Sequence, residues 1–203
     1  TVYKNGAKEI AALNGRSLTF MAKWSMEDVG SSCHLHSSLW DAEGTESLTW
    51  DPDAADHMSE VYRHYVGGLI ATGRELAWCY APYVNSYKRY MPDSWAPTAL
   101  VWGRDNRTCG LRTVGHGKGF RVENRVPGAD CNPYLAFAAT IAAGLHGIEQ
   151  GIEPGPAYTA NAYEAADVPR VPATLVEAIE LFEASEVARE AFRLAANKLS
   201  IPT

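Results

Sequence analysis

The chain has 203 residues, of which 46% are hydrophobic and 21% are charged, and its formal net charge is -6. A chain of this length can form one domain that buries roughly 70% of the surface exposed by its unfolded form. No apolar run approaches the roughly 20 residues that span a bilayer and no basic arm is present, so we expect a cytoplasmic protein that binds neither membranes nor nucleic acid.

Three stretches of the chain predict helices. Apolar residues recur at spacings of three and four in the first stretch, which indicates a helix over about residues 53–79. Asn132-Pro133 is a typical N-cap and first turn, and it opens an alanine-rich helix that Gly151 can end. The capping box Thr174–Glu177 starts a third helix, which restarts near Ser185.

Short strands are expected beside these helices. The segments that fit strands are residues 17–23, 33–40, 98–103, 109–114 and 120–126. The proline-bearing segment 151–172 is expected to be a loop. Because the strands and helices do not alternate regularly, the pattern indicates the α+β class.

Two of the expected strands carry polar side chains on one face. Successive side chains of a strand point to opposite faces, so His34 and His36 share a face. Arg121, Glu123 and Arg125 likewise share a face of their own strand. The alternate positions suit a buried face, Asn124 excepted: Cys33, Leu35, Val122 and Val126. An imidazole and a carboxylate can hold Mg or Mn, and guanidiniums bind phosphate or carboxylate oxygens. The two strand motifs together therefore predict a phosphoryl-transfer site.

Each of these motifs alone has a simpler interpretation. A His-x-His pair is common on a half-exposed sheet face, and Arg-x-Glu-x-Arg is usually a cross-strand ladder of ion pairs. The segment between them favours a site, because it adds Arg89 in a loop and Arg107 and Arg112 around a turn. A charged surface on which Asp93 and Asp105 pair with these arginines would explain the local excess of positive charge but not the motifs.

Five ordered motifs resemble the C-terminal half of the glutamine synthetase catalytic domain: Gly30–Leu39, Asn85–Arg89, Asn106–Thr108, Arg121–Pro127 and Asn132–Ala139. The resemblance spans most of the chain and weakens after about residue 155. Within that family the chain is most similar to the group that includes γ-glutamyl-amine ligases. The resemblance implies a curved antiparallel sheet flanked by helices.

The resemblance also implies roles for the matched polar residues. His34 and Glu123 match ligands of a metal ion, Mg or Mn, of which a complete site holds two or more. Arg89 and Arg125 match positions that bind the carboxylates of glutamate, and Arg125 positions the carboxylate that is phosphorylated. Gly30 matches a glycine whose backbone approaches glutamate.

Further matched positions concern ATP. Arg107 matches the arginine that neutralises the transferring phosphoryl group, so the resemblance gives it contacts with both substrates and a catalytic role beside Arg125. The other positions that match nucleotide contacts are His36, Ser37, Ser38, Arg112 and Lys118.

Two departures from the family pattern concern the acceptor of the glutamyl group. Val29 stands where the family usually has an asparagine that touches glutamate, and Trp95 stands where glutamine synthetases have a glutamate near the ammonium. Both changes remove polar groups, so an organic amine that contacts Trp95 is expected in place of ammonia. Tyr163 lies where some bacterial family members carry an adenylylated tyrosine, but its flanking sequence matches poorly and an unmodified loop tyrosine is favoured.

Family members are more than twice as long as this chain. The resemblance therefore implies that residues 1–203 form the C-terminal portion of a catalytic domain, and that a β-grasp domain and a Glu-x-Glu strand precede Thr1. The family assembles into rings with each active site between neighbouring subunits. A homo-oligomeric ring, specifically a dodecamer, is thus implied.

These observations together predict an ATP-dependent ligase that joins the γ-carboxylate of glutamate to an amine through γ-glutamyl phosphate. Glutamine synthetase itself, using ammonia, is the alternative within the class. A non-catalytic assembly or regulatory relative is the alternative of another class. A phosphagen-type kinase shares this sheet architecture, but the His34 and His36 pair fits it poorly.

Overall fold

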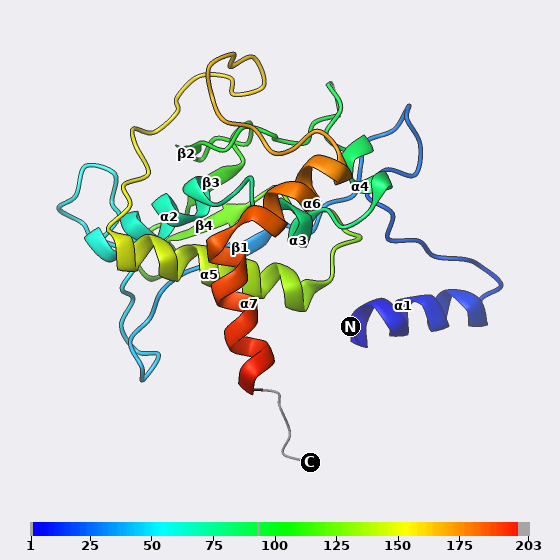
Figure 1. Ribbon diagram of the computed structural model, residues 1–203, viewed down its shortest axis with the longest axis horizontal. Coiled ribbons are helices and arrows are strands. Elements are labelled where there is room, and N and C mark those ends of the chain that lie inside the picture. The colour runs from blue at the N-terminus through cyan, green and yellow to red at the C-terminus, as the bar shows by residue number, and fades with distance from the viewer. Residues whose placement is uncertain (1, 93, 199–203) are drawn as a thin grey trace.

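The computed structural model describes residues 2–92 and 94–198, and it places a four-stranded sheet among helices (Figure 1). The strands are β1 (Leu35–Ser37), β2 (Trp102–Arg104), β3 (Leu111–Val114) and β4 (Arg121–Asn124). The helices, with one 3-10 turn, are α1 (Val2–Leu13), α2 (Glu60–Ala71), α3 (Ala77–Tyr80), α4 (Val84–Lys88), η1 (Gly117–Gly119), α5 (Pro133–Gln150), α6 (Leu175–Ala184) and α7 (Glu186–Lys198). The α+β class is confirmed.

The sheet has the strand order β1-β4-β3-β2 and mixed directions. β4 is antiparallel to both β1 and β3, but β2 and β3 are parallel, so the expectation of a wholly antiparallel sheet is wrong at this edge. The connection between them is short and turns sharply at Asp105, whose φ of 49° lies in the left-handed region. Asp and Asn tolerate that region better than most residues, and here it lets the chain double back beside β2.

Most of the expected helix boundaries are confirmed. Asn132 caps α5 through its side chain, and the helix ends at Gly151, which has a φ of 61°. Thr174 caps α6, and α7 follows after Ser185.

The long helix expected over residues 53–79 is shorter and divided. Ser59 caps α2 by accepting a hydrogen bond from Tyr62 N, and the helix stops at Thr72. The hydroxyl and the backbone N–H of Thr72 both donate to Gly68 O, which closes the last turn before α3 begins. The apolar pattern thus located the buried face but not the break in the helix.

The segment before β1 differs from expectation. No strand forms over residues 17–23 in the described structure, whereas α1 was not expected. At Lys23 the backbone N–H and C=O bond to the side chain of Asn85, so a side chain takes the place of a strand partner. The segment is therefore held against α4 without a sheet ladder.

The helices α2 and α5 pack closely against one another through glycines. A Cβ at Gly147 would lie 2.1 Å from His64 O, and a Cβ at Gly68 would lie 2.1 Å from Ala143 O. Only hydrogen can occupy these positions, so the two backbones meet directly. Their inner faces join the underside of the sheet in one core that contains Tyr62, Val66, Leu69, Leu111, Phe120, Val122 and Val126.

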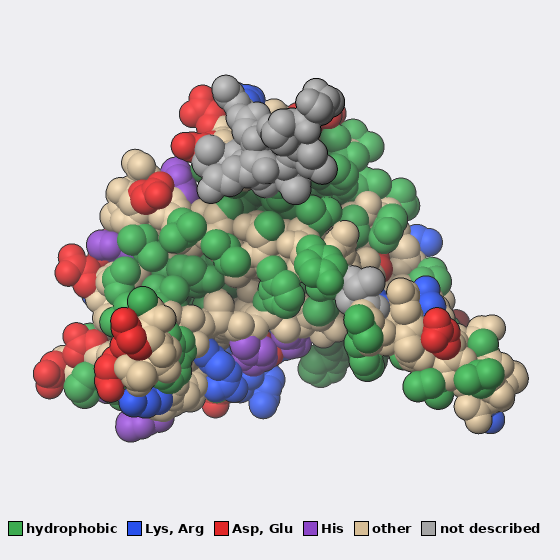
Figure 2. All heavy atoms as spheres, turned by 90° about the horizontal axis from the view of Figure 1, so that it is seen from below, with side chains coloured by type: hydrophobic (Ala, Val, Ile, Leu, Met, Phe, Trp, Pro, Cys, Tyr) green, Lys and Arg blue, Asp and Glu red, His purple; other side chains and the backbone are tan. Residues whose placement is uncertain are grey.

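Two helices expose apolar faces. None of the residues of α1 is buried, and Val2, Tyr3, Ile10 and Leu13 are all exposed. The outer face of α5 exposes Tyr134, Leu135, Phe137, Ile141 and Leu145. Figure 2 shows hydrophobic side chains gathered across the side of the molecule on which α5 lies. None of the helices in the described ranges has the length and hydropathy needed to cross a membrane.

Candidate active site

The two motifs singled out in the sequence lie side by side on the sheet. The register pairs His36 of β1 with Glu123 of β4, and Glu123 with Arg112 of β3, so the three residues form a row across adjacent strands. Cross-strand partners on one face lie within reach of each other. The prediction that the two strands present His34 and Glu123 to a common side is confirmed, whereas the place of Arg112 in the row was not predicted. Leu35 and Val122 on the alternate positions are buried in the core.

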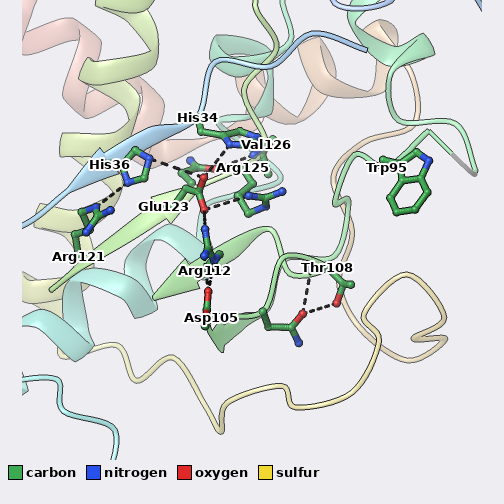
Figure 3. Close-up of polar contacts among 12 residues, drawn as sticks. His34, His36, Trp95, Asp105, Thr108, Arg112, Arg121, Glu123, Arg125 and Val126 are labelled. Carbon is green, nitrogen blue, oxygen red and sulfur yellow. Dashed lines mark hydrogen bonds and ion pairs between the residues drawn. The ribbon is translucent and has the colours of Figure 1, made fainter. Parts of the chain in front are cut away.

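Glu123 is the centre of this row, and it is only 5% exposed. Its Oε1 lies 2.8 Å from His34 Nδ1 and 3.8 Å from His36 Nε2. Its Oε2 accepts hydrogen bonds from Arg112 Nη1 at 2.9 Å and from Arg125 Nη1 at 3.1 Å. Figure 3 shows the two histidines and the two arginines converging on this one carboxylate.

The surroundings of Glu123 keep it ionised. Burial alone would raise its pKa, but the hydrogen bond from Arg112 and the charge of Arg125 outweigh burial and lower the pKa to about 2. At neutral pH the carboxylate therefore carries a full charge that the two guanidiniums partly balance.

The two histidines have the opposite tendency. Burial and then the charge of Arg125 lower the pKa of His34 despite the nearby carboxylate, and burial also lowers the pKa of His36. Both rings are thus neutral at neutral pH, the form in which imidazole binds metal ions. Arg121 Nε donates to His36 Nδ1 at 3.0 Å, which fixes the orientation of that ring.

Arg112 is itself held on both sides. Its Nε donates to Asp105 Oδ1 at 2.9 Å, and its Nη2 also contacts that oxygen. Asp105 in turn has its pKa lowered by the hydrogen bond and the charge of Arg112. The ion pair thereby connects the turn before Arg107 to the Glu123 carboxylate.

The turn that carries Arg107 is fastened to a distant loop. The Nδ2 of Asn106 donates to Tyr158 O and Ala160 O, both at 3.0 Å, and Asn106 Oδ1 accepts from Thr108. The side chain of Arg107 is exposed and makes no hydrogen bond or ion pair within residues 2–92 and 94–198. Its guanidinium is therefore available to a ligand.

Arg89 is 3% exposed and lies beneath Arg125. Its Nη1 donates to Val126 O at 2.7 Å and its Nη2 to Arg125 O at 3.0 Å, so it supports the backbone at the end of β4. A Cβ at Gly30 would lie 3.0 Å from Arg89 Cγ and 2.6 Å from Ala22 O. The absence of a side chain at Gly30 is thus required by contact with Arg89 and the preceding loop.

The residues expected to contact a nucleotide lie around the ends of β1 and β4. Ser37 O accepts from Tyr62 OH at 2.7 Å, and Ser38 Oγ accepts from Trp40 Nε1 at 3.0 Å. Lys118 Nζ donates to Thr45 O at 2.8 Å, which brings η1 against the segment that follows β1. These side chains are at the same end of the sheet as His36.

Trp95 lies apart from the Glu123 cluster, on a separate loop (Figure 3). Its side chain is 74% exposed and its φ of 62° lies in the left-handed region, which is rare for a bulky residue. A cavity of about 670 Å³ lies beside it, between this loop and the loop that carries Tyr163. Val29 is also exposed.

The sequence analysis gave no site role to Arg121, Asp105 or Glu164. Arg121 was placed on the correct face, and its spacing of two from Glu123 was the signal that could have assigned it to His36. Asp105 was considered only as a surface partner, although it holds Arg112. Glu164, which lines the cavity beside Trp95, lies in a loop without any periodic pattern.

A metal ion would find only part of a ligand set here. Across residues 2–92 and 94–198, no three His, Cys, Asp or Glu side chains are arranged to hold a metal ion. The pair of His34 and Glu123 offers one nitrogen and one hard oxygen, a donor set that suits Mg or Mn when water or phosphate oxygens complete it.

Comparisons with known proteins agree on one family. The family model described as glutamine synthetase, catalytic domain, matches residues 1–197. A γ-glutamylethanolamide synthetase of Streptomyces coelicolor is 55% identical over 196 residues, which are 94% of this chain and 40% of that protein. A glutamate–isopropylamine ligase of Pseudomonas sp. is 45% identical over 192 residues, which are 93% of this chain and 42% of that protein.

More distant relatives include a glutamine synthetase of Frankia alni, which is 39% identical over 191 residues, 90% of this chain and 40% of that protein. Among solved structures, a GmaS–ADP complex superposes with a TM-score of 0.85 at 32% identity, covering 99% of this chain and 50% of that one. The chain thus spans about 40% of the length of the curated relatives it matches.

Proposed function

The chain belongs to the glutamine synthetase family, and from this premise we propose that it is part of an ATP-dependent ligase that joins the γ-carboxylate of glutamate to an amine. One observation carries the proposal most strongly: the Glu123 carboxylate has one oxygen facing His34 and the other held by Arg112 and Arg125. One oxygen of this carboxylate can bind a cation. The guanidiniums that contact the other oxygen can bind anionic substrates.

His34 and Glu123 would hold a divalent ion, Mg or Mn, and oxygens of water or substrate would complete its ligands. Because His34 is neutral and Glu123 is ionised, neither has to lose a proton before it binds the ion. When bound, the ion offsets negative charge on the phosphate oxygens of ATP.

Arg125 binds the γ-carboxylate of glutamate. Its Nη1 contacts Glu123, but its Nε is buried and has no hydrogen-bond partner in the described chain. A buried donor without a partner costs free energy, which a substrate oxygen would recover. Arg89 and Gly30 belong to the same glutamate site, and Arg89 also supports it by donating to the carbonyl oxygens of Arg125 and Val126.

Arg107 neutralises the transferring phosphoryl group, in contact with both ATP and glutamate. Its exposed guanidinium extends from a turn that hydrogen bonds from Asn106 to Tyr158 O and Ala160 O hold in place. The nucleotide extends over the end of the sheet, where His36, Ser37, Ser38, Arg112 and Lys118 lie. One relative in this fold has been solved as a complex with ADP.

The reaction follows from these contacts in two steps. The γ-carboxylate oxygen attacks the terminal phosphorus of ATP, ADP leaves, and a γ-glutamyl phosphate forms. The amine nitrogen, having lost a proton, then attacks the acyl carbon, and the carbon–oxygen bond to phosphate breaks with release of inorganic phosphate.

The acceptor is a small organic amine. Trp95 presents a large aromatic face, which can pack against a carbon chain or attract an ammonium group. Two relatives named for organic amines are 55% and 45% identical to the chain, against 39% for the glutamine synthetase described above. Glutamine synthesis from ammonia is the second candidate within the class.

The complete protein is a cytoplasmic ring of identical subunits, and a dodecamer is the expected form. The outer face of α5 and the residues of α1 expose apolar side chains, and this exposure supports the proposal that both helices are covered by other protein surface in the assembly.

Release of ADP and phosphate by the complete protein tests the proposed function. A ligase releases both only when glutamate and an amine are present together. A kinase would leave a stable phosphorylated product, and an assembly subunit would release neither.

A further inference from the structure

The cavity beside Trp95 is bounded by two loops that are already fixed to each other. Tyr163 OH donates to Trp95 O at 2.9 Å, and Arg170 Nη1 donates to Thr98 Oγ1 at 2.6 Å. The Nη2 of Arg170 also bonds to three carbonyls of its own loop, so its donors serve the protein. Burial raises the pKa of Tyr163, which therefore stays protonated as the donor. The walls of the cavity are preformed.

One aromatic residue links the cavity to the candidate active site. Tyr90 lines it, and Tyr90 OH donates at 2.9 Å to Val126 O, the same carbonyl that Arg89 binds. The charges of Arg125 and Arg89 also act on the phenol of Tyr163. The wall of the cavity is thus joined, through Tyr90, to the backbone beside Arg125.

Among the described residues, the lining combines aromatic faces with the carboxylate of Glu164. Tyr90, Trp95 and Tyr163 supply the aromatic surface, and Glu164 lines the same space. Glu164 Oε1 accepts a hydrogen bond from Asn161 at 2.7 Å, and within the described residues Glu164 forms no ion pair. Aromatic rings bind short carbon chains and cations, whereas a carboxylate selects a hydrogen-bond donor.

We infer that this cavity binds the tail of the acceptor amine, and that Glu164 recognises a second hydrogen-bond donor, a hydroxyl or an ammonium group, at the far end of that tail. Trp95 and Tyr163 pack against the carbons between the two polar ends. The inference rests on the proposed function and narrows its substrate class to amines with a distal donor, as opposed to simple alkylamines.

The experiment compares three amines of similar length on the complete protein: ethanolamine, 1,3-diaminopropane and n-propylamine. Binding is measured by calorimetry, and turnover by phosphate release with glutamate and ATP. Glu164→Gln removes the charge at nearly constant shape, and Asp167→Asn is the control, because Asp167 is an exposed carboxylate of the same loop that does not line the cavity.

Glu164→Gln should weaken the affinity and kcat/KM for 1,3-diaminopropane by about 10-fold or more, because a hydrogen bond between two charged groups is lost. The loss for ethanolamine should be smaller, n-propylamine should be unaffected, and Asp167→Asn should change none of the three. Unchanged selectivity among the amines in Glu164→Gln, in binding and in turnover alike, would overturn the inference.

The two proposals fail differently. Binding with the expected selectivity but without phosphate release would contradict the ligase function and leave the cavity assignment standing. Efficient phosphate release with the same amine preference in wild type and Glu164→Gln would support the ligase and refute the cavity assignment.

Discussion

His36 and Glu123 are paired residues of β1 and β4, and the 3.8 Å between Nε2 and Oε1 makes Glu123 the point where the two sequence motifs meet. His36 and Arg112, from the strands on either side, therefore face the same carboxylate.

Glu123→Gln should lower phosphate release by the complete protein on the order of 100-fold or more, because the cation would lose a charged ligand and the phosphoryl oxygens would then lose the cation. The fold should persist, since the side chains have nearly the same shape. Steady-state phosphate release and circular dichroism measure the two effects. Glu180→Gln, at an exposed position of α6, is the matched control.

Glu123 should also make stability depend on pH. Its folded pKa of about 2 lies below the 4.5 of the unfolded chain, so the ionised form stabilises the fold above pH 4.5 and this contribution is lost as pH falls toward 2. The contribution is at most about 3 kcal/mol. Urea unfolding of wild type and Glu123→Gln between pH 6 and pH 3 measures it; parallel stability curves for the two proteins would contradict the assignment.

Gly147→Ala should destabilise the protein by roughly 1–3 kcal/mol or more, because its Cβ would lie 2.1 Å from the backbone oxygen of His64. Gly6→Ala in α1 is the control, since nothing lies within 4 Å of that Cβ. The control should be neutral or slightly stabilising, because alanine favours helix over glycine. Equal unfolding midpoints in urea for the two variants would rule out the close helix contact.

Trp95→Glu should shift the ratio of kcat/KM values toward ammonia. Losing the aromatic face should cost an organic amine about 0.5–2 kcal/mol, or roughly 2- to 30-fold. Trp24→Glu is the control, because Trp24 is also exposed and does not line the cavity. Efficient turnover of ammonia by the wild type, with no turnover of any organic amine, would instead support glutamine synthesis from ammonia.

Light scattering on the complete protein should show a large ring, and placing a charge on the outer face of α5, as in Ile141→Lys, should weaken its assembly or its fold. Ile141 is 56% exposed in this chain, so a purely solvent-facing position would tolerate lysine with little change. A stable, active monomer would count heavily against the proposed assembly.

The sequence predicted the parts of the fold that depend on local rules. The caps at Asn132 and Thr174 follow from spacing along one segment. So does the face that His34 shares with His36. The resemblance supplied the family, which the comparisons confirm. The individual site roles stay predictions.

What the sequence did not predict depends on contacts between distant segments. The parallel pairing of β2 with β3 follows a turn at Asp105 that Arg112 holds from seven residues away. The backbone N–H of Lys23 donates to the side chain of Asn85, and no periodic pattern in the sequence relates these two residues. The cavity needs Trp95 and Tyr163 together, and no spacing rule relates two loops so far apart.

Arg125 contacts Glu123 and is also the proposed ligand of glutamate, so the same guanidinium serves two partners. A cation that draws on the charge of Glu123 would loosen its hold on Arg125, and glutamate that engages Arg125 would free Glu123 for the cation. Binding free energies are reciprocal, so each ligand should raise the affinity for the other by the same factor. The substrate and the ion would then bind as a synergistic pair, and neither alone would saturate the site at the concentration that suffices for both.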